Sequence, residues 1–246
     1  MQLTENVHVV GSGWLGFGLS HDLDCHVYLV NGGTEMALID AGVGLEVDRI
    51  IANIRADGLD PGRLKYVLLT HAHADHAGGC KYWRDRFGVR VLASPEAARF
   101  VSTGDEAGIS LAAAKAGGFY PADYHFQGCP ADGELRESDV LRVGDCELRA
   151  IETSGHCCGM LSFLMTADGR THLFSGDSIF HGGKILMTNV YDCDFQQYVN
   201  SLQKLGKLSV DALLPGHLCV ALSGGQSHIQ KALDCLARMV LPANLL

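Results

Sequence analysis

Short apolar runs alternate along this chain with segments in which apolar residues recur every three or four positions. The apolar runs are typical of buried β-strands, and the longer spacing is typical of helices with one apolar face. Strands are predicted over residues 7–10, 25–30, 36–40, 65–70, 89–93, 140–143, 146–153, 160–166, 171–174 and 210–214. Helices are predicted over residues 46–56, 77–87, 95–101, 109–116, 195–205 and 226–240.

The order of these elements predicts an α/β fold class. Strands are followed by helices twice along the chain, and no linker, low-complexity tract or block of like charges divides the two parts. Because a sheet must bury its apolar faces, we expect two sheets enclosed by helices. The 246 residues are long enough for one large domain or two small ones, and we expect a single domain over residues 1–246.

Two irregular stretches interrupt the pattern. Residues 11–16 match the glycine spacing of a dinucleotide-binding loop, but no helical spacing follows them, so we interpret them as a hairpin loop. Trp14 and Phe17 lie at its tip, either as a flap over a site or packed on a neighbouring strand. Residues 119–130 are rich in aromatic side chains and predict either a substrate-binding wall or a separate hydrophobic cluster.

The densest group of chemically active residues follows the predicted strand at 65–70, where His71, His73, Asp75 and His76 lie close together. Imidazole and carboxylate are ligands that zinc and similar divalent metals prefer. Alternate side chains of an extended segment point the same way, so His71 and His73 can bind one ion. Asp75 and His76 follow where a helix begins and can face a second ion. The other interpretation is a polar loop that is rich in histidine by chance, which this ligand spacing disfavours.

Three further residues of the same kind lie directly after glycine at predicted strand ends. They are His156, Asp177 and His217. Taken alone, each is more typical of a solvated loop residue than of a ligand. Together with the histidine-rich segment they complete seven candidate ligands, enough for two metal ions that share one carboxylate. Asp40 ends another strand, where we expect it either to cap the chain or to support a ligand.

Charge and cysteine content narrow the classes of function. The sequence has 19 basic and 28 acidic residues and a formal net charge of −9, which argues against binding to nucleic acid phosphates. No apolar run approaches the roughly 18 residues of a membrane-spanning helix, so no membrane partner is expected. The 9 cysteines include no Cys-x-x-Cys pair and the first residues do not resemble a secretory leader, so we expect a reducing, cytoplasmic location. Near the candidate ligands, Cys157, Cys158 and Cys219 are expected to be buried structural thiols.

The run His-x-His-x-Asp-His at residues 71–76, followed by Gly155-His156, Gly176-Asp177 and Gly216-His217, resembles the metallo-β-lactamase-fold hydrolases. The resemblance extends from the strand ending at Asp40 to His217. It implies a four-layer αββα sandwich with two divalent metal ions at one edge of the sheets. Zn²⁺ is favoured, with iron or manganese as alternatives.

The same resemblance implies how the ligands divide between the ions. The first site would consist of His71, His73 and His156, and the second of Asp75, His76 and His217. Asp177 would bridge both ions. The implied reaction is hydrolysis by a hydroxide that both ions hold. Asp75 would orient that hydroxide and pass a proton to the leaving group, which makes it the candidate catalytic residue.

Departures from the family patterns narrow the reaction further. Antibiotic-hydrolysing lactamases lack a bridging Asp, so Asp177 argues against β-lactamase activity. Phe180 stands where the quorum-signal lactonases carry Tyr. The segment is similar instead to the glyoxalase-two type, which hydrolyses the thioester of hydroxyacyl-glutathione. Residues 218–246 are too few for the glutathione-binding domain of that family. Lys184 is shifted from the basic position expected there, and we expect it to remain solvated rather than to bind a substrate carboxylate.

These observations predict a binuclear metal-dependent hydrolase of a small ester, thioester or lactone. A mononuclear iron dioxygenase of the persulfide type has a similar histidine pattern and is the first alternative. A non-catalytic, ligand-binding member of the fold is the second. The expected partner is a small-molecule substrate. The oligomeric state is left open, with a homodimer as one option.

Overall fold

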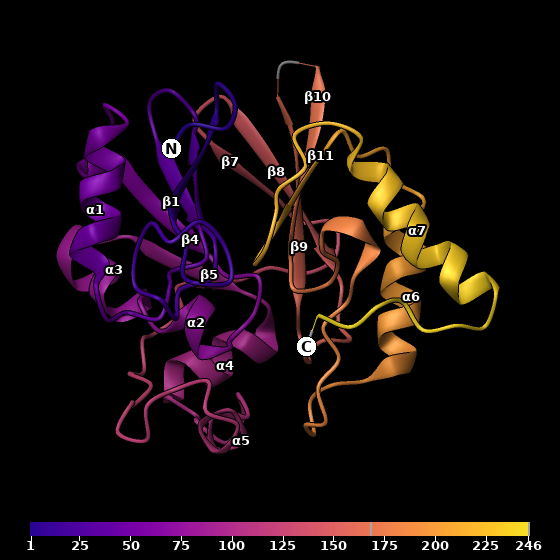
Figure 1. Ribbon diagram of the computed structural model, residues 1–246. Coiled ribbons are helices and arrows are strands. Elements are labelled where there is room, and N and C mark those ends of the chain that lie inside the picture. The colour runs from indigo at the N-terminus through magenta and orange to yellow at the C-terminus, as the bar shows by residue number, and fades with distance from the viewer. Residues whose placement is uncertain (168, 246) are drawn as a thin grey trace.

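Two β-sheets lie face to face between layers of helices (Figure 1). The computed structural model describes residues 1–167 and 169–245. The first sheet has the strand order β1-β2-β3-β4-β5-β6, with β1 Val7–Gly11, β2 Val27–Asn31, β3 Met36–Ile39, β4 Leu64–Leu68, β5 Arg90–Ala93 and β6 Gly133–Glu134. The second has the order β11-β10-β9-β8-β7, with β7 Val140–Val143, β8 Cys146–Glu152, β9 Leu161–Ala167, β10 Arg170–Gly176 and β11 Ala212–Pro215.

Most strands away from the β7–β8 edge are apolar on both faces because both faces are covered, whereas β8 alternates buried and exposed residues. In β2, Tyr28 and Val30 pack in the core between the two sheets, whereas Leu29 points the other way, toward the helices. In β10, Phe174 belongs to the inter-sheet core and Leu173 to the core beneath the outer helices. This alternation follows from the two-residue period of a strand. It explains why the sequence shows continuous apolar runs rather than an alternation of apolar and polar residues.

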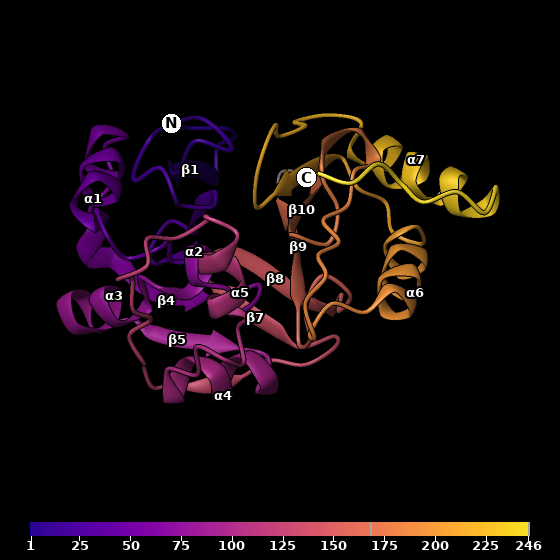
Figure 2. The same cartoon turned by 60° about the horizontal axis from the view of Figure 1, so that its bottom comes forward.

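Helices cover the outer face of each sheet (Figure 2). The first sheet carries α1 Val47–Ala56, α3 Cys80–Phe87 and α4 Pro95–Thr103, and the second carries α6 Phe195–Leu205 and α7 Gly225–Ala237. Two short helices, α2 Ala74–Ala77 and α5 Leu111–Ala116, lie near one edge of the sheets, and 3-10 turns occur at Pro61–Arg63 and His181–Gly183. The predicted four-layer α/β sandwich is therefore confirmed. None of the described helices has the length and apolar character needed to cross a membrane.

One predicted helix is wrong in its boundaries. Residues 77–87 form the end of α2 and the whole of α3, with a break at Gly78 and Gly79. A Cβ atom at Gly78 would lie 2.4 Å from the carbonyl oxygen of Val43, and one at Gly79 would lie 2.2 Å from that of Ala41. The chain therefore passes close to another backbone segment at this point, which only glycine allows. Hydrophobic spacing does not reveal such a contact.

The other differences are small. The last helix ends at Ala237 rather than at residue 240, and Met239 beyond it has a left-handed backbone with φ of 54°. The two-residue strand β6 was not predicted, because so short a strand leaves no pattern. Residues 11–16 are not followed by a helix, in agreement with the hairpin interpretation, and β1 pairs antiparallel with β2.

The direction of the strands determines where a site can form. β3, β4 and β5 run parallel to one another, and β10 runs parallel to β11. The carboxyl ends of parallel strands lie at the same edge of their sheet, and the loops that leave them gather there. Six of the seven candidate ligands follow β4, β10 or β11. His156 follows β8, which runs in the same direction as β10 because both strands are antiparallel to β9.

Candidate metal centre

The histidine-rich segment leaves the carboxyl end of β4 and turns into α2. His71 and His73 precede the helix in extended backbone, while Asp75 and His76 lie within its single turn. All four side chains therefore leave the same end of β4, and the centroids of the His71 and His76 rings are 4.0 Å apart. His71 and His76 are fully buried.

The other three residues follow strands of the second sheet. His156 comes after β8, Asp177 directly after β10, and His217 shortly after β11. A Cβ atom at Gly216 would lie 2.3 Å from Asp177 Oδ1, so the glycine before His217 makes room for that carboxylate. At this position, a glycine precedes the candidate ligand because a larger residue would clash with the Asp177 carboxylate.

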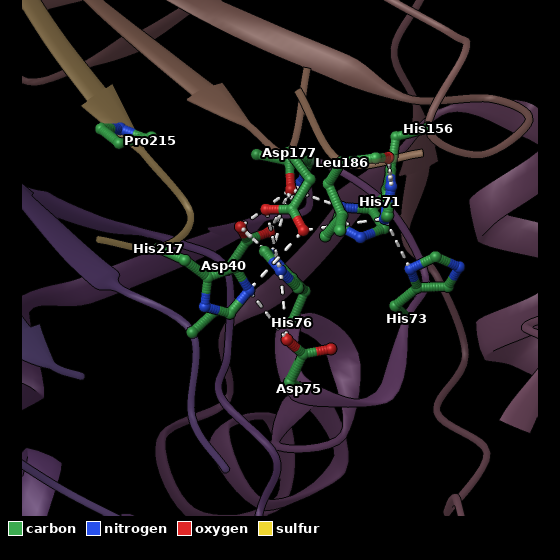
Figure 3. Close-up of polar contacts among 12 residues, drawn as sticks. Asp40, His71, His73, Asp75, His76, His156, Asp177, Leu186, Pro215 and His217 are labelled. Carbon is green, nitrogen blue, oxygen red and sulfur yellow. Dashed lines mark hydrogen bonds and ion pairs between the residues drawn. The ribbon is translucent and has the colours of Figure 1, made fainter. Parts of the chain in front are cut away.

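All seven residues meet at one place (Figure 3). The candidate ligand atoms of each predicted triad lie within 4.8 Å of one another; the triads are His71, His73 and His156, and Asp75, His76 and His217. His73 Nδ1 is 3.0 Å from His156 Nε2 in the first, and Asp75 Oδ2 is 3.1 Å from His217 Nε2 in the second. Zn–N bonds of about 2.0 Å in a tetrahedron place their donor atoms roughly 3.3 Å apart. The observed separations have that size.

Asp177 lies between the triads. Its Oδ2 atom is 3.7 Å from His156 Nε2 and 3.6 Å from His217 Nε2, so one oxygen faces a member of each triad. Its Oδ1 atom is 3.5 Å from His76 Nε2. The carboxylate is buried. This position allows one side chain to contact cations held in either triad.

Several buried polar atoms at this place make no hydrogen bond within the described part of the chain. They are His71 Nε2, His76 Nε2 and Asp177 Oδ1. A buried polar atom without a partner costs about 1–3 kcal/mol, and native proteins rarely leave several together. A cation would supply the missing interaction for all three atoms. The donor set, five histidine rings with two carboxylates, also suits zinc or a similar divalent ion.

The opposite nitrogen of each buried ring is held by the protein. Asp40 accepts a hydrogen bond at Oδ2 from His76 Nδ1 over 2.8 Å and at Oδ1 from the backbone N–H of Thr70 over 2.7 Å. The Thr70 hydroxyl is 3.0 Å from His71 Nδ1 and also donates to Asp40. These contacts leave Nε2 of both rings directed at the centre. Of the two roles considered for Asp40, support of a ligand is the one observed.

A second carboxylate, Asp192, holds His73. Its Oδ2 atom is 3.3 Å from His73 Nε2, and its Oδ1 atom accepts a hydrogen bond of 2.8 Å from the hydroxyl of Ser110. His156 is held in a similar way, because its Nδ1 lies 2.8 Å from the carbonyl oxygen of Leu186. Asp192 was not predicted from the sequence, because it lies in an irregular loop with no motif around it.

Asp75 also has a partner that the sequence did not single out. The hydroxyl of Tyr120 donates to Asp75 Oδ1 over 2.8 Å and accepts from the Asp75 backbone N–H over 3.1 Å. Tyr120 belongs to the aromatic 119–130 stretch, which therefore does form part of the wall of the site. Tyr124 and Phe126 of the same stretch instead pack in the core on the first sheet. Both interpretations of this stretch hold, each for a different part of it.

Burial and neighbouring charges shift the pKa values here. Burial and the adjacent rings lower the pKa of His71 well below its usual range, and burial with neighbouring His73 lowers the pKa of His156 to about 4. Both rings are therefore neutral near pH 7, which is the form that binds a metal. Burial opposes ionisation of Asp75, but His76, His217 and His73 together outweigh it and lower the pKa, so the carboxylate stays ionised.

Comparison with known proteins identifies the family. Residues 22–217 match the family model described as Metallo-beta-lactamase superfamily. The chain belongs to this superfamily. The matched range contains all seven clustered residues, and the resemblance inferred from the sequence is confirmed.

Solved structures of metallo-beta-lactamases share the fold. BJP-1, a subclass B3 enzyme of Bradyrhizobium japonicum, superposes with a TM-score of 0.72 at 22% sequence identity, covering 97% of this chain and 92% of its own. FEZ-1 from Legionella gormanii also gives a TM-score of 0.72, at 21% identity, covering 95% of this chain and 92% of its own. At this level of identity the likeness establishes the fold of a superfamily member and nothing narrower.

The curated relatives that match this chain carry the names of several different thioesterases and hydrolases. An atrochrysone carboxyl ACP thioesterase of Aspergillus fumigatus is 25% identical over 85% of this chain and 55% of its own length. A hydroxyacylglutathione hydrolase of Chelativorans sp. is 29% identical over 72% of this chain and 55% of its own. An acyl-coenzyme A thioesterase of Gallus gallus is 30% identical over 78% of this chain and 72% of its own. The chain thus spans about half the length of the first two relatives.

Other residues noted in the sequence lie outside the centre. Lys184 is exposed, as expected of a solvated lysine. Cys157 is buried, but Cys158 is only partly buried and Cys219 is exposed, so the expectation of a buried thiol is wrong for Cys219. Its loop follows Leu218, whose left-handed backbone with φ of 66° turns the chain away from the core. Trp14 at the hairpin tip is 60% exposed.

Proposed function

We propose that this chain is a binuclear metal-dependent hydrolase that cleaves thioesters, with small esters or lactones as chemically related substrates. The observation that carries the proposal is the position of Asp177 Oδ2, 3.7 Å from a histidine of one triad and 3.6 Å from a histidine of the other. A carboxylate in that position fits two neighbouring cations better than one. The names of the thioesterase and hydroxyacylglutathione hydrolase relatives support the thioester among the three substrate types.

The proposed ligands divide as the triads do. His71, His73 and His156 would hold the first ion and Asp75, His76 and His217 the second, with Asp177 shared. Two bound divalent ions would supply Lewis acidity for the substrate carbonyl and a water of lowered pKa. Zn²⁺ is the proposed metal because imidazole and carboxylate donors predominate.

The chain's own groups would then orient the reactants. Asp75 is fixed on one side by Tyr120 and on the other by His217, so its carboxylate is aligned before substrate arrives. In that position it would orient the attacking water and pass a proton to the leaving sulfur. The water oxygen forms a bond to the carbonyl carbon, the C–S bond breaks, and the products are a carboxylic acid and a thiol. Burial of the surrounding groups excludes competing water molecules.

A substrate panel tests the proposal. We expect the metal-loaded protein to release thiol from acyl thioesters at least about 10³-fold faster than buffer does, a modest value for an enzyme. β-Lactams and phosphodiesters, assayed in parallel, should react far more slowly. The measurement is thiol release followed colorimetrically, with metal content determined on the same sample. Full metal loading without turnover of any thioester, ester or lactone would overturn the proposal.

Substitution of Asp40 tests whether the ring orientation serves metal binding. Asp40→Asn should weaken metal affinity about 10–100-fold, because residues that orient ligand histidines have effects of this size. Asn tolerates the left-handed backbone of this position, where φ is 64°, so the fold should be retained. Competition titration against a chelator measures the affinity. Exposed Asp145→Asn serves as the control, and equal affinities for the two variants would contradict the assignment.

A further inference from the structure

A cavity of about 310 Å³ opens beside the metal centre, and its chemistry indicates which substrate it takes. The floor is formed by five of the seven clustered residues, and the walls are largely apolar, including Ile109, Leu111, Ala114, Leu186, Val190 and Leu245. Resting on the proposed thioester hydrolysis, we propose that this cavity binds an uncharged, apolar acyl group of the substrate. The acyl carbon chain would lie along the walls while the carbonyl faces the metal centre.

The lining of the cavity disfavours anionic acyl groups. Asp75 and Asp177 line it, and no lysine or arginine is among the described residues that do. A carboxylate carried on the acyl chain would therefore lose its hydration without gaining a cationic partner, which is strongly unfavourable. The two ions would be occupied by the carbonyl and the water. An alkyl chain has no charge whose hydration would be lost on entering such a cavity, and removing its apolar surface from water is favourable.

Two segments that are distant in sequence contribute to the walls. One is α5 with the residues that flank it, and the other is the 186–190 segment. The hydroxyl of Tyr191 donates to the carbonyl oxygen of Gly108 over 2.7 Å, and the hydroxyl of Ser110 donates to Asp192 over 2.8 Å. These two hydrogen bonds join the walls at one end of the cavity. The distance between the walls is thereby fixed.

The joined walls are also tied to the reacting centre. Asp192 accepts from Ser110 with one oxygen and lies 3.3 Å from His73 Nε2 with the other. Its side chain is buried, so this link is shielded from water. The acyl cavity is therefore positioned relative to His73. Because the cavity is fixed relative to the reacting centre, an acyl chain that fills it also positions the carbonyl group, so chain length can affect the reaction rate.

A series of thioesters of one small neutral thiol tests the proposal. With N-acetylcysteamine thioesters from acetyl to octanoyl, kcat/KM should rise about three- to fourfold per methylene until the cavity is filled, as expected for burial of each group. The succinyl thioester should be at least tenfold poorer than the butyryl thioester of equal carbon number. These comparisons use the metal-loaded full chain.

Variants locate the effect in the cavity. Ala114→Phe fills the α5 wall and should lower the ratio of octanoyl to acetyl kcat/KM at least tenfold. Ala112→Phe, an exposed position on the same helix, is the control and should leave the ratio unchanged. Val190→Phe fills cavity space from the 186–190 segment and provides a second test if Ala114→Phe does not fold. Thermal unfolding of each variant checks that the fold is retained.

The outcomes distinguish this inference from the proposed function. Thioester hydrolysis that does not depend on chain length would show that the cavity does not bind the acyl chain. The same conclusion would follow if both cavity-filling variants kept the wild-type ratio of octanoyl to acetyl kcat/KM. In either case the hydrolase proposal would stand. If succinyl and butyryl thioesters react equally, the exclusion of anionic groups is wrong. If no thioester is hydrolysed by the metal-loaded protein, the proposed function itself fails.

Discussion

Replacing Asp177 by Ala is expected to reduce thioester turnover at least about 10³-fold, a loss typical of removing a central group of an active site. The metal content should fall from about two ions per chain to one or fewer. The reason is that Asp177 Oδ2 faces a member of each triad, so its removal withdraws a ligand from both ions at once. Initial rates measure the turnover, and elemental analysis after dialysis against metal-free buffer measures the metal content.

Asp145→Ala is the matched control for Asp177→Ala, since it removes an exposed carboxylate from the turn before β8, at the opposite end of that strand from His156. It should keep full activity and metal content. Asp177→Asn separates charge from size, because it retains the volume next to Gly216. Unchanged metal stoichiometry in Asp177→Ala would mean that the two-ion assignment is incorrect.

Removal of metal should abolish activity and lower the thermal stability of the protein. Without a cation, His71 Nε2 and His76 Nε2 are buried with no hydrogen bond among the described residues, and three carboxylates lie near one another. A ligand that binds only the folded state stabilises it by about 4 kcal/mol at a free concentration 1,000 times its dissociation constant. Calorimetry of the chelated and metal-loaded forms should therefore show a higher melting temperature for the loaded form.

Restoring individual metals distinguishes the two reaction classes. Zn²⁺ should restore thioester hydrolysis and should saturate at about two ions per chain. Fe²⁺ under anaerobic conditions, followed by oxygen and a persulfide, tests the dioxygenase alternative. Oxygen consumption at one iron per chain, without thioester hydrolysis by the zinc form, would replace the hydrolase proposal. A chelated protein with unchanged activity would exclude metal chemistry altogether.

The sequence was sufficient for the parts of the molecule that depend on periodicity and on a dense motif. Apolar runs located strands in both sheets, and helical spacing located α1 and α6 to within a residue or two. The seven candidate ligands follow strands that end at the same edge, and the structure brings them together. The predicted strands and helices agree with the structure because burial imposes a period on the chain.

Contacts between distant segments could not be predicted in the same way. Asp192 and Tyr120 approach His73 and Asp75 only because irregular loops fold back over the centre. No spacing in their own segments records that approach. The break at Gly78 has the same origin, since it depends on a backbone that passes nearby rather than on local preference. An isolated carboxylate in a loop reveals its partner only in three dimensions.

Each sheet is built from one continuous part of the chain, and each triad takes two members from the first part and one from the second. As a ribosome makes this protein, the first sheet is synthesised with His71, His73, Asp75 and His76 but with neither triad complete. His217 emerges after the last strand of the second sheet, so the centre closes only after both sheets have been synthesised. A chain interrupted before that point would be unable to hydrolyse anything by this chemistry, and catalytic activity would report that both sheets have docked.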